Sequence, residues 1–176
     1  GVVVETGKNV KHLSNGDSIA IEPGSGCGRC NYCLEGRYNL CKEMDFMAAP
    51  PFNRGALSKF VSHPANMVFK LPDNMDTKEG ALIEPLSVGM YAANRANAKP
   101  GKTAMILGAG CIGLMTIAAL KTMGVDDIVV ADLFENRLQN ALKMGATTVI
   151  NAKEKNTKDE VLKITDGCGM DFVFET

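Results

Sequence analysis

A glycine-rich turn, Gly108-Ala109-Gly110-Cys111-Ile112-Gly113, is the feature that most restricts the fold of this 176-residue chain. The residues directly before it, 104–107, form a short apolar run, as expected of a buried parallel strand. The residues after it, 112–123, carry apolar side chains at helical spacing, and Gly124 suits a helix C-terminus. A strand, a glycine turn and a helix in this order predict the start of a βαβ unit.

Strand and helix patterns continue to alternate after this turn. The later segments are predicted strands at 128–131, 148–150 and 172–174 and predicted helices at 137–144 and 159–164. Such alternation predicts an α/β fold with a doubly wound parallel sheet of the Rossmann type. Another helix is predicted to begin at Asp76, because Glu79 three residues later completes a capping box.

Each glycine of the turn has its own expected role in a dinucleotide site. Gly108 permits the tight turn, Gly110 lets the backbone approach a pyrophosphate, and Gly113 lets helix and strand pack closely. Ile112 belongs to the helix N-terminus, whose N–H groups and positive dipole suit phosphates. The alternative is a similar fold whose glycine turn binds nothing.

Asp132 ends the second predicted strand of this half. A carboxylate there accepts hydrogen bonds from the adenosine ribose hydroxyls and repels a 2′-phosphate, so NAD is predicted in preference to NADP. Arg137 either lies over the adenosine or is a solvated helix charge. Cys111 lies under the expected cofactor and is interpreted as a small helix-entry residue, not as a nucleophile.

Four of the six cysteines, Cys27, Cys30, Cys33 and Cys41, lie within fifteen residues. Four thiolates make a closed tetrahedral site for a structural zinc, with no open position for catalysis. Disulfides are one alternative. An iron–sulfur cluster is another, but its sequence run needs a fourth cysteine after three residues, followed by proline. Here the gap is seven residues and Lys42 follows, which favours zinc in a reducing compartment.

Residues 1 to about 75 have a different pattern from the α/β half. Short apolar runs punctuated by Gly and Pro predict strands of an irregular β-barrel or sandwich at 2–4, 18–21, 56–61 and 67–69. Both ends of the chain have the pattern of strand interiors. The chain is therefore expected to be incomplete.

Composition excludes several classes of function. The net charge of −1 and the hydrophobic share of 45% are typical of soluble globular proteins and give no basic surface for nucleic acid. No apolar run is long enough to cross a membrane, and no signal peptide is visible. A cytoplasmic protein without nucleic-acid or membrane partners is expected.

Further segments carry a family resemblance. They are 10–13 (VKHL), 20–24 (AIEPG), 36–40 (GRYNL), 49–51 (APP), 70–74 (KLPDN) and 79–89 (EGALIEPLSVG). Together with the cysteines and the glycine turn, they resemble the zinc-containing medium-chain dehydrogenases, in the sorbitol (L-iditol) and xylitol dehydrogenase branch. The resemblance extends over essentially the whole chain, and 79–89 is its most specific part.

The resemblance implies both a fold and a reaction. Residues 1–84 are expected to be part of a GroES-like β-barrel catalytic domain with a zinc lobe at 27–41, and residues 85–176 part of a Rossmann NAD-binding domain. The implied reaction is the NAD-dependent oxidation of a polyol to a ketose at a second, catalytic zinc. The complete enzyme is expected to be a homotetramer.

The resemblance also implies two catalytic-site residues. Glu84 matches the family's acid beside the catalytic zinc; otherwise it is a helix-start acid before Pro85. Phe46 matches a substrate-pocket aromatic; otherwise it is a core residue. The other ligands of that zinc, a Cys and a His-Glu pair, are expected upstream of Gly1.

Three other functions remain to be weighed. A threonine or secondary-alcohol dehydrogenase belongs to the same family. A non-catalytic module that binds zinc and NAD would use the same motifs. A zinc-ribbon nucleic-acid binder is disfavoured by the near-neutral charge and by the lack of a second CxxC pair.

Overall fold

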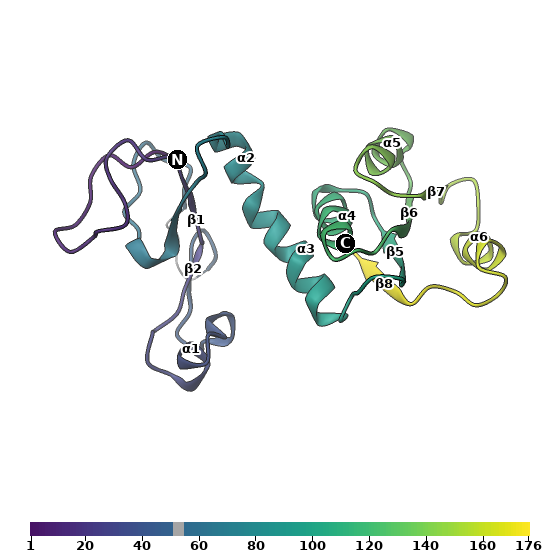
Figure 1. The fold of residues 1–176 in the computed structure, drawn as a ribbon, viewed down its shortest axis with the longest axis horizontal. Helices are drawn as coiled ribbons and strands as arrows, with labels where there is room; N and C mark the ends of the chain where they lie inside the picture. Colours follow the sequence, from purple (N-terminus) through teal and green to yellow (C-terminus); the bar gives the residue numbers. More distant parts are fainter. Residues whose placement is uncertain (51–54) are drawn as a thin grey trace. The chain divides into compact units, whose positions relative to one another are not determined.

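The computed structural model describes residues 1–50 and 55–176, so the predicted segment 49–51 lies partly outside the described residues (Figure 1). The chain forms two compact units, residues 1–82 and residues 83–176. Across the described ranges, no helix combines the length and the apolar character needed to cross a membrane.

The second unit is built on a parallel sheet whose strands stand in the order β7-β6-β5-β8. The strands are β5 (Thr103–Leu107), β6 (Asp127–Asp132), β7 (Thr148–Asn151) and β8 (Phe172–Glu175). In chain order this is 3-2-1-4, the arrangement of the first four strands of a Rossmann sheet. All four strands predicted for this half are confirmed.

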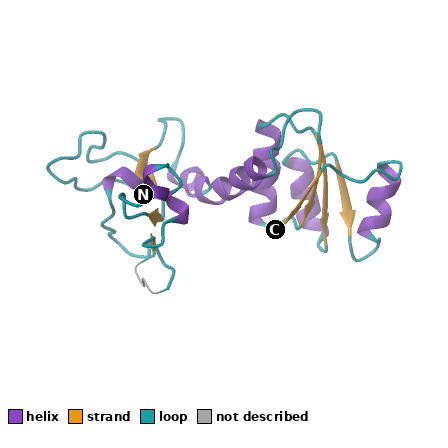
Figure 2. Cartoon of the chain, turned by 90° about the horizontal axis from the view of Figure 1, so that it is seen from below, coloured by secondary structure: helices purple, strands orange, loops and turns teal. Residues whose placement is uncertain are grey.

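Helices lie on both sides of this sheet (Figure 2). They are α3 (Ile83–Arg95), α4 (Cys111–Thr122), α5 (Glu135–Lys143) and α6 (Thr157–Ile164). Successive residues of a strand point to opposite faces, so Ile106 and Met105 belong to two different hydrophobic clusters. The cluster around Ile106 includes Ile117 and Leu120 of α4, both fully buried. Each such side chain contributes about 1.5–3 kcal/mol of burial free energy.

The first unit contains little regular structure. Among the described residues, β1 (Ile19–Ile21) pairs with β4 (Val68–Lys70), and β2 (Gly24–Ser25) pairs with β3 (Asp45–Phe46), both antiparallel. The short helices are α1 (Asn31–Leu34), η1 (Tyr38–Leu40), η2 (Ala65–Met67) and α2 (Thr77–Ala81). The predicted capping box is confirmed, because the Asp76 side chain accepts from the Glu79 amide and the Glu79 side chain accepts from the Asp76 amide.

Two strands predicted for this unit are wrong. Val2 forms only an isolated bridge with Ser18, and residues 56–61 are irregular. Leu57 and Phe60 are exposed, so the apolar period of that segment does not correspond to a buried strand face. Two-residue periodicity predicts a strand only where a partner strand completes the hydrogen-bond ladder.

Candidate functional site

The glycine turn joins β5 to α4, and two of its glycines are required by the fold. Gly108 has φ +103°, and a Cβ there would lie 2.4 Å from the backbone oxygen of Thr176. A Cβ on Gly113 would lie 2.0 Å from the carbonyl oxygen of Gly108. The tight turn and the close helix–strand packing predicted for these two glycines are therefore both present in the structure.

Gly110 differs from its two neighbours in the motif. Its φ of −74° is open to any residue, and a Cβ there would meet no described atom within 4 Å. Neither backbone conformation nor packing explains a glycine at this position. Open space above a backbone is what a pyrophosphate needs for close approach.

The N-terminus of α4 adds hydrogen-bond donors to this space. Gly110 is the N-cap, and within the described chain no side chain caps the helix. The first amides of a helix have no partner inside it, so those of Cys111 and Ile112 can donate to a phosphate. Cys111 is exposed and the glycines of the motif have no side chains, so the turn presents mainly backbone.

Asp132 is fixed beside the turn at the end of β6. One carboxylate oxygen accepts from the amide of Ala109 at 2.8 Å, and the other accepts from the amide of Phe134 at 2.9 Å. Burial alone would raise the pKa of Asp132, but these amides and the charge of Arg137 outweigh it and lower the pKa. Because each oxygen keeps a second lone pair, the ionised carboxylate can still accept from ribose hydroxyls.

Arg137 lies close to this carboxylate and is not simply a solvated helix charge. Its Nη1 is 3.7 Å from Oδ2 of Asp132, and its guanidinium carbon is 5.1 Å from the ring centroid of Phe134. The guanidinium side chain remains half exposed. The predicted position over an adenosine is compatible with this geometry.

Sequence reasoning missed two residues near Asp132. Phe134 is the N-cap of α5, and Lys153 follows β7; the Lys153 Nζ lies 4.5 Å from the Phe134 ring centroid. The signal available in the sequence was weak, since Phe134 is only two residues beyond Asp132 and Lys153 is one lysine among several. The parallel pairing of β6 with β7 brings them together.

The cysteine lobe, residues 27–41, gathers its four sulfur atoms into one cluster. The Sγ atoms of Cys27, Cys30, Cys33 and Cys41 all lie within 4.8 Å of one another. A tetrahedral zinc with bonds of about 2.3 Å places its thiolates about 3.8 Å apart, so the cluster suits this metal. All six cysteines of the chain are free thiols, which does not support the disulfide alternative.

The local environment of the thiols also suits a cation. Backbone N–H groups of Arg29 and Cys30 lower the pKa of Cys27 to about 7. Burial, together with hydrogen bonds with the neighbouring thiols, raises the pKa of Cys33 to about 12. Four adjacent thiolates repel one another, and a divalent metal that deprotonates its ligands removes this conflict. The residues present therefore fit a structural zinc.

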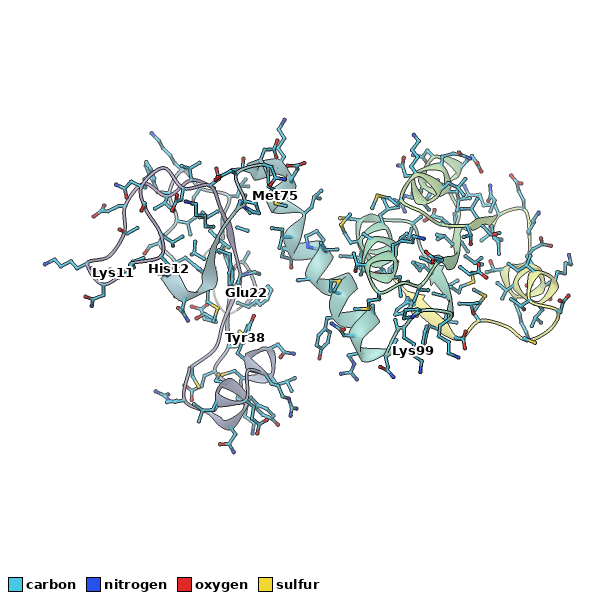
Figure 3. All side chains as sticks on the ribbon, viewed as in Figure 1. Lys11, His12, Glu22, Tyr38, Met75 and Lys99 are labelled. Carbon is cyan, nitrogen blue, oxygen red and sulfur yellow. The ribbon has the colours of Figure 1, made fainter. Side chains whose placement is uncertain are left out.

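Gly26 and Tyr38 determine how the cysteine lobe packs within its unit. Gly26 leaves room for the cluster, because a Cβ there would lie 2.7 Å from Sγ of Cys33. Tyr38 lies next to Glu22 (Figure 3), where burial raises the pKa of the Tyr38 hydroxyl and the charge of Glu22 and a hydrogen bond with it raise it further. Glu22 directly follows β1, so this contact orients the lobe.

The purified chain is expected to contain one zinc and no iron. Cys33→Ser should lower the zinc content and loosen the lobe, yet leave binding of ADP-ribose intact, because the glycine turn belongs to the other compact unit. Elemental analysis and calorimetric titration measure the two effects. Cys168→Ser, at an exposed cysteine outside the cluster, is the matched control and should keep its zinc. An iron–sulfur absorption band would contradict the assignment.

The two predicted catalytic-site residues are both exposed. Glu84 lies in the first turn of α3, where its carbonyl accepts from the Ser87 hydroxyl at 2.7 Å. Phe46 ends β3 with 41% of its surface exposed, so it is not a core residue of the described unit. Their proposed roles stay predictions, since they belong to different compact units.

Comparison with protein families supports both halves of the chain. Residues 1–73 match the alcohol dehydrogenase GroES-like domain, and residues 111–176 match the zinc-binding dehydrogenase family. The predicted fold class, part of a GroES-like domain followed by the first part of a Rossmann sheet, is confirmed.

Individual relatives agree with this assignment. A sorbitol dehydrogenase of Bacillus subtilis is 44% identical over the whole chain, which covers 50% of that protein. A crystal structure of an Escherichia coli oxidoreductase of unknown specificity is 52% identical with a TM-score of 0.97, over 100% of this chain and 51% of that one. A zinc-binding dehydrogenase of Sinorhizobium meliloti bound to NADP is 29% identical with a TM-score of 0.88, over 99% and 51%. The chain spans about half the length of the curated relatives it matches.

Proposed function

Because this chain belongs to the family of zinc-dependent alcohol dehydrogenases, as its resemblance predicted, we propose that the protein oxidises a polyol of the sorbitol or xylitol type to a ketose with NAD. The substrate class is supported by sorbitol dehydrogenase relatives that are 44% identical over the chain. The observation that carries the cofactor assignment is the ionised Asp132, held beside an open glycine turn.

The two compact units have different proposed roles. The cysteine lobe holds a structural zinc and keeps its part of the first unit ordered. Gly108, Gly110, Ile112 and Gly113 receive the pyrophosphate, while Asp132 and Arg137 receive the adenosine. A catalytic metal would lie beside Glu84, and Phe46 would line the substrate pocket. When bound, a catalytic zinc lowers the pKa of the polyol hydroxyl, and NAD accepts the hydride.

The assembly and location belong to the same proposal. A homotetramer is expected for the complete enzyme, as its family resemblance implies. A cluster of free thiols with zinc persists best in a reducing compartment, which supports a cytoplasmic location. The proposed partner is a small polyol, and neither nucleic acid nor a membrane is part of the proposal.

Asp132→Ala is expected to weaken NAD binding and to narrow the preference for NAD over NADP. Each well-made ribose hydrogen bond to a carboxylate contributes roughly 1.5–3 kcal/mol, and its loss is joined by relief of the repulsion of a 2′-phosphate. Calorimetric titration with both dinucleotides measures the ratio of the two affinities.

Two further variants separate this effect from damage to the turn. Asp132→Asn removes the charge and keeps one oxygen that can accept from the Ala109 amide, although its NH2 group can no longer accept from the Phe134 amide. It therefore removes the repulsion of a 2′-phosphate with less damage to the turn than Asp132→Ala. Asp127→Ala changes an acid at the opposite end of the same strand and should leave the ratio unchanged. An NAD-to-NADP ratio that does not move in Asp132→Ala would count against the assignment of Asp132.

A further inference from the structure

Phe134 is an exposed aromatic ring that carries two cations. Its surface is 47% exposed at the start of α5, where an apolar ring gains little from burial. The guanidinium of Arg137 lies 5.1 Å from the ring centroid and the ammonium of Lys153 lies 4.5 Å from it. Cations within about 6 Å of a ring centroid are attracted to the ring face, so Phe134 holds both at one place.

That place adjoins the carboxylate of Asp132. The amide of Phe134 donates to the Asp132 carboxylate at 2.9 Å, and the amide of Ala152, next to Lys153, donates to the Asp132 carbonyl at 3.0 Å. Backbone hydrogen bonds therefore fix the position of the segment that carries Lys153 relative to Asp132. The ammonium of Lys153, which lies against the Phe134 ring, therefore extends from a backbone position fixed beside the adenosine half-site.

Lys153 and Arg137 relate differently to Asp132. Arg137 lies 3.7 Å from the carboxylate, so much of its charge is compensated there. In the described chain Lys153 has no carboxylate within ion-pair distance, whereas Lys155 in the same loop pairs with Glu160 at 3.3 Å. The neighbouring acids Glu135 and Glu154 accept hydrogen bonds from Gln139 and Asn151 instead. The ammonium of Lys153 is thus available to an anionic ligand.

We propose that Lys153, held against Phe134, is a specificity-determining residue for the adenosine 2′ position and acts against Asp132. The carboxylate repels a 2′-phosphate, and the ammonium attracts it. The site therefore discriminates against NADP less strongly than Asp132 alone would require. This inference rests on the proposed function, because it needs a dinucleotide at the glycine turn.

The test compares two ligands that differ only in the 2′-phosphate. ADP-ribose and 2′-phospho-ADP-ribose are titrated into the 176-residue chain by calorimetry, with wild type, Lys153→Met and Lys153→Arg. Lys153→Met is expected to weaken binding of the phosphorylated ligand about two- to tenfold, the size of a partly exposed charge interaction with a phosphate, and of ADP-ribose less than twofold. Lys153→Arg should retain the wild-type ratio.

Three further measurements test whether the effect is specific to Lys153, depends on Phe134 and is electrostatic. Lys155→Met removes the same charge from the same loop and should leave the ratio of affinities unchanged. Phe134→Leu removes the ring that holds the ammonium and should shift the ratio in the same direction as Lys153→Met. Raising NaCl from about 0.05 M to about 0.5 M shortens the screening length and should shrink the difference between wild type and Lys153→Met.

The possible outcomes separate this inference from the proposed function. If both ligands bind and Lys153→Met leaves their ratio unchanged, or weakens both equally, the inference is overturned while the dinucleotide site stands. If neither ligand binds the wild-type chain, the proposed dinucleotide site fails, and the inference fails with it. A shift as large in Lys155→Met as in Lys153→Met would also overturn it, because only general charge would be acting.

Discussion

The 176-residue chain, expressed alone, is expected to form no NADH from NAD⁺ with sorbitol or xylitol, even with added zinc. Activation of an alcohol needs a metal with an open coordination position beside the substrate. Within the described ranges, the four cysteines are the only group of three or more potential ligands from His, Cys, Asp and Glu. That group is closed by four thiolates, and Glu84 alone cannot hold a tetrahedral zinc.

NADH absorbance over time provides the measurement. A sorbitol dehydrogenase such as that of Bacillus subtilis serves as the positive control, and a blank without protein sets the background. Turnover above that blank would refute the expectation and reveal a metal with an open coordination position. Adding Cys33→Ser to such an experiment would show whether the lobe itself is responsible, since loss of turnover with the lobe would locate the active metal there.

The absence of NADH formation would not by itself exclude a non-catalytic module that binds zinc and NAD. A chain that binds zinc and ADP-ribose but turns over no substrate fits both a module and part of a dehydrogenase. Where the gene encodes residues on either side of this chain, the longer product distinguishes them, because only a dehydrogenase gains turnover. Comparing sorbitol, xylitol, threonine and a simple secondary alcohol as substrates then distinguishes a polyol dehydrogenase from a threonine or secondary-alcohol dehydrogenase.

The second unit could be predicted from the sequence because its signals are local. Each strand is a short apolar run, each helix has its own periodicity, and Gly124 and Gly145 end their helices with positive φ values. The order of the strands is that of the first half of a Rossmann sheet, which the glycine turn and its flanking strand and helix predict. The first unit was harder to predict, because residues 56–61 have an apolar pattern and yet no partner strand among the described residues. Whether a strand finds a partner is a property of the whole fold.

In the candidate site, too, residues with local signals could be predicted and residues whose contacts depend on strand pairing could not. The glycines and Asp132 could be predicted, because a single turn and the strand beside it determine their roles. Phe134 and Lys153 could not, since their contact depends on the register between β6 and β7, in which Asp132 lies opposite Asn151. The cysteine cluster could be predicted from spacing alone, because four ligands within fifteen residues need only one short loop to converge.

Gly113→Ala is expected to destabilise the second unit and to abolish measurable ADP-ribose binding. The new Cβ would lie 2.0 Å from the Gly108 carbonyl oxygen and 3.0 Å from the Thr176 hydroxyl. Since the first contact is with backbone, no side chain can rotate away, and α4 must move from β5. Gly108 is itself held by its amide, which donates to the Ala131 carbonyl at 2.8 Å. The strain therefore passes into the pyrophosphate turn.

Thermal unfolding and calorimetric titration with ADP-ribose measure the two consequences of Gly113→Ala. Overpacking costs roughly 1–3 kcal/mol, which lowers the Tm of a unit of this size by about 5–15 °C. Gly110→Ala is the matched comparison, because its Cβ meets open space in the described structure. It should keep the wild-type Tm yet weaken ADP-ribose binding, since the methyl group occupies the space of the pyrophosphate. If Gly113→Ala retained both its Tm and its affinity, the close packing of α4 on β5 would not support the dinucleotide site.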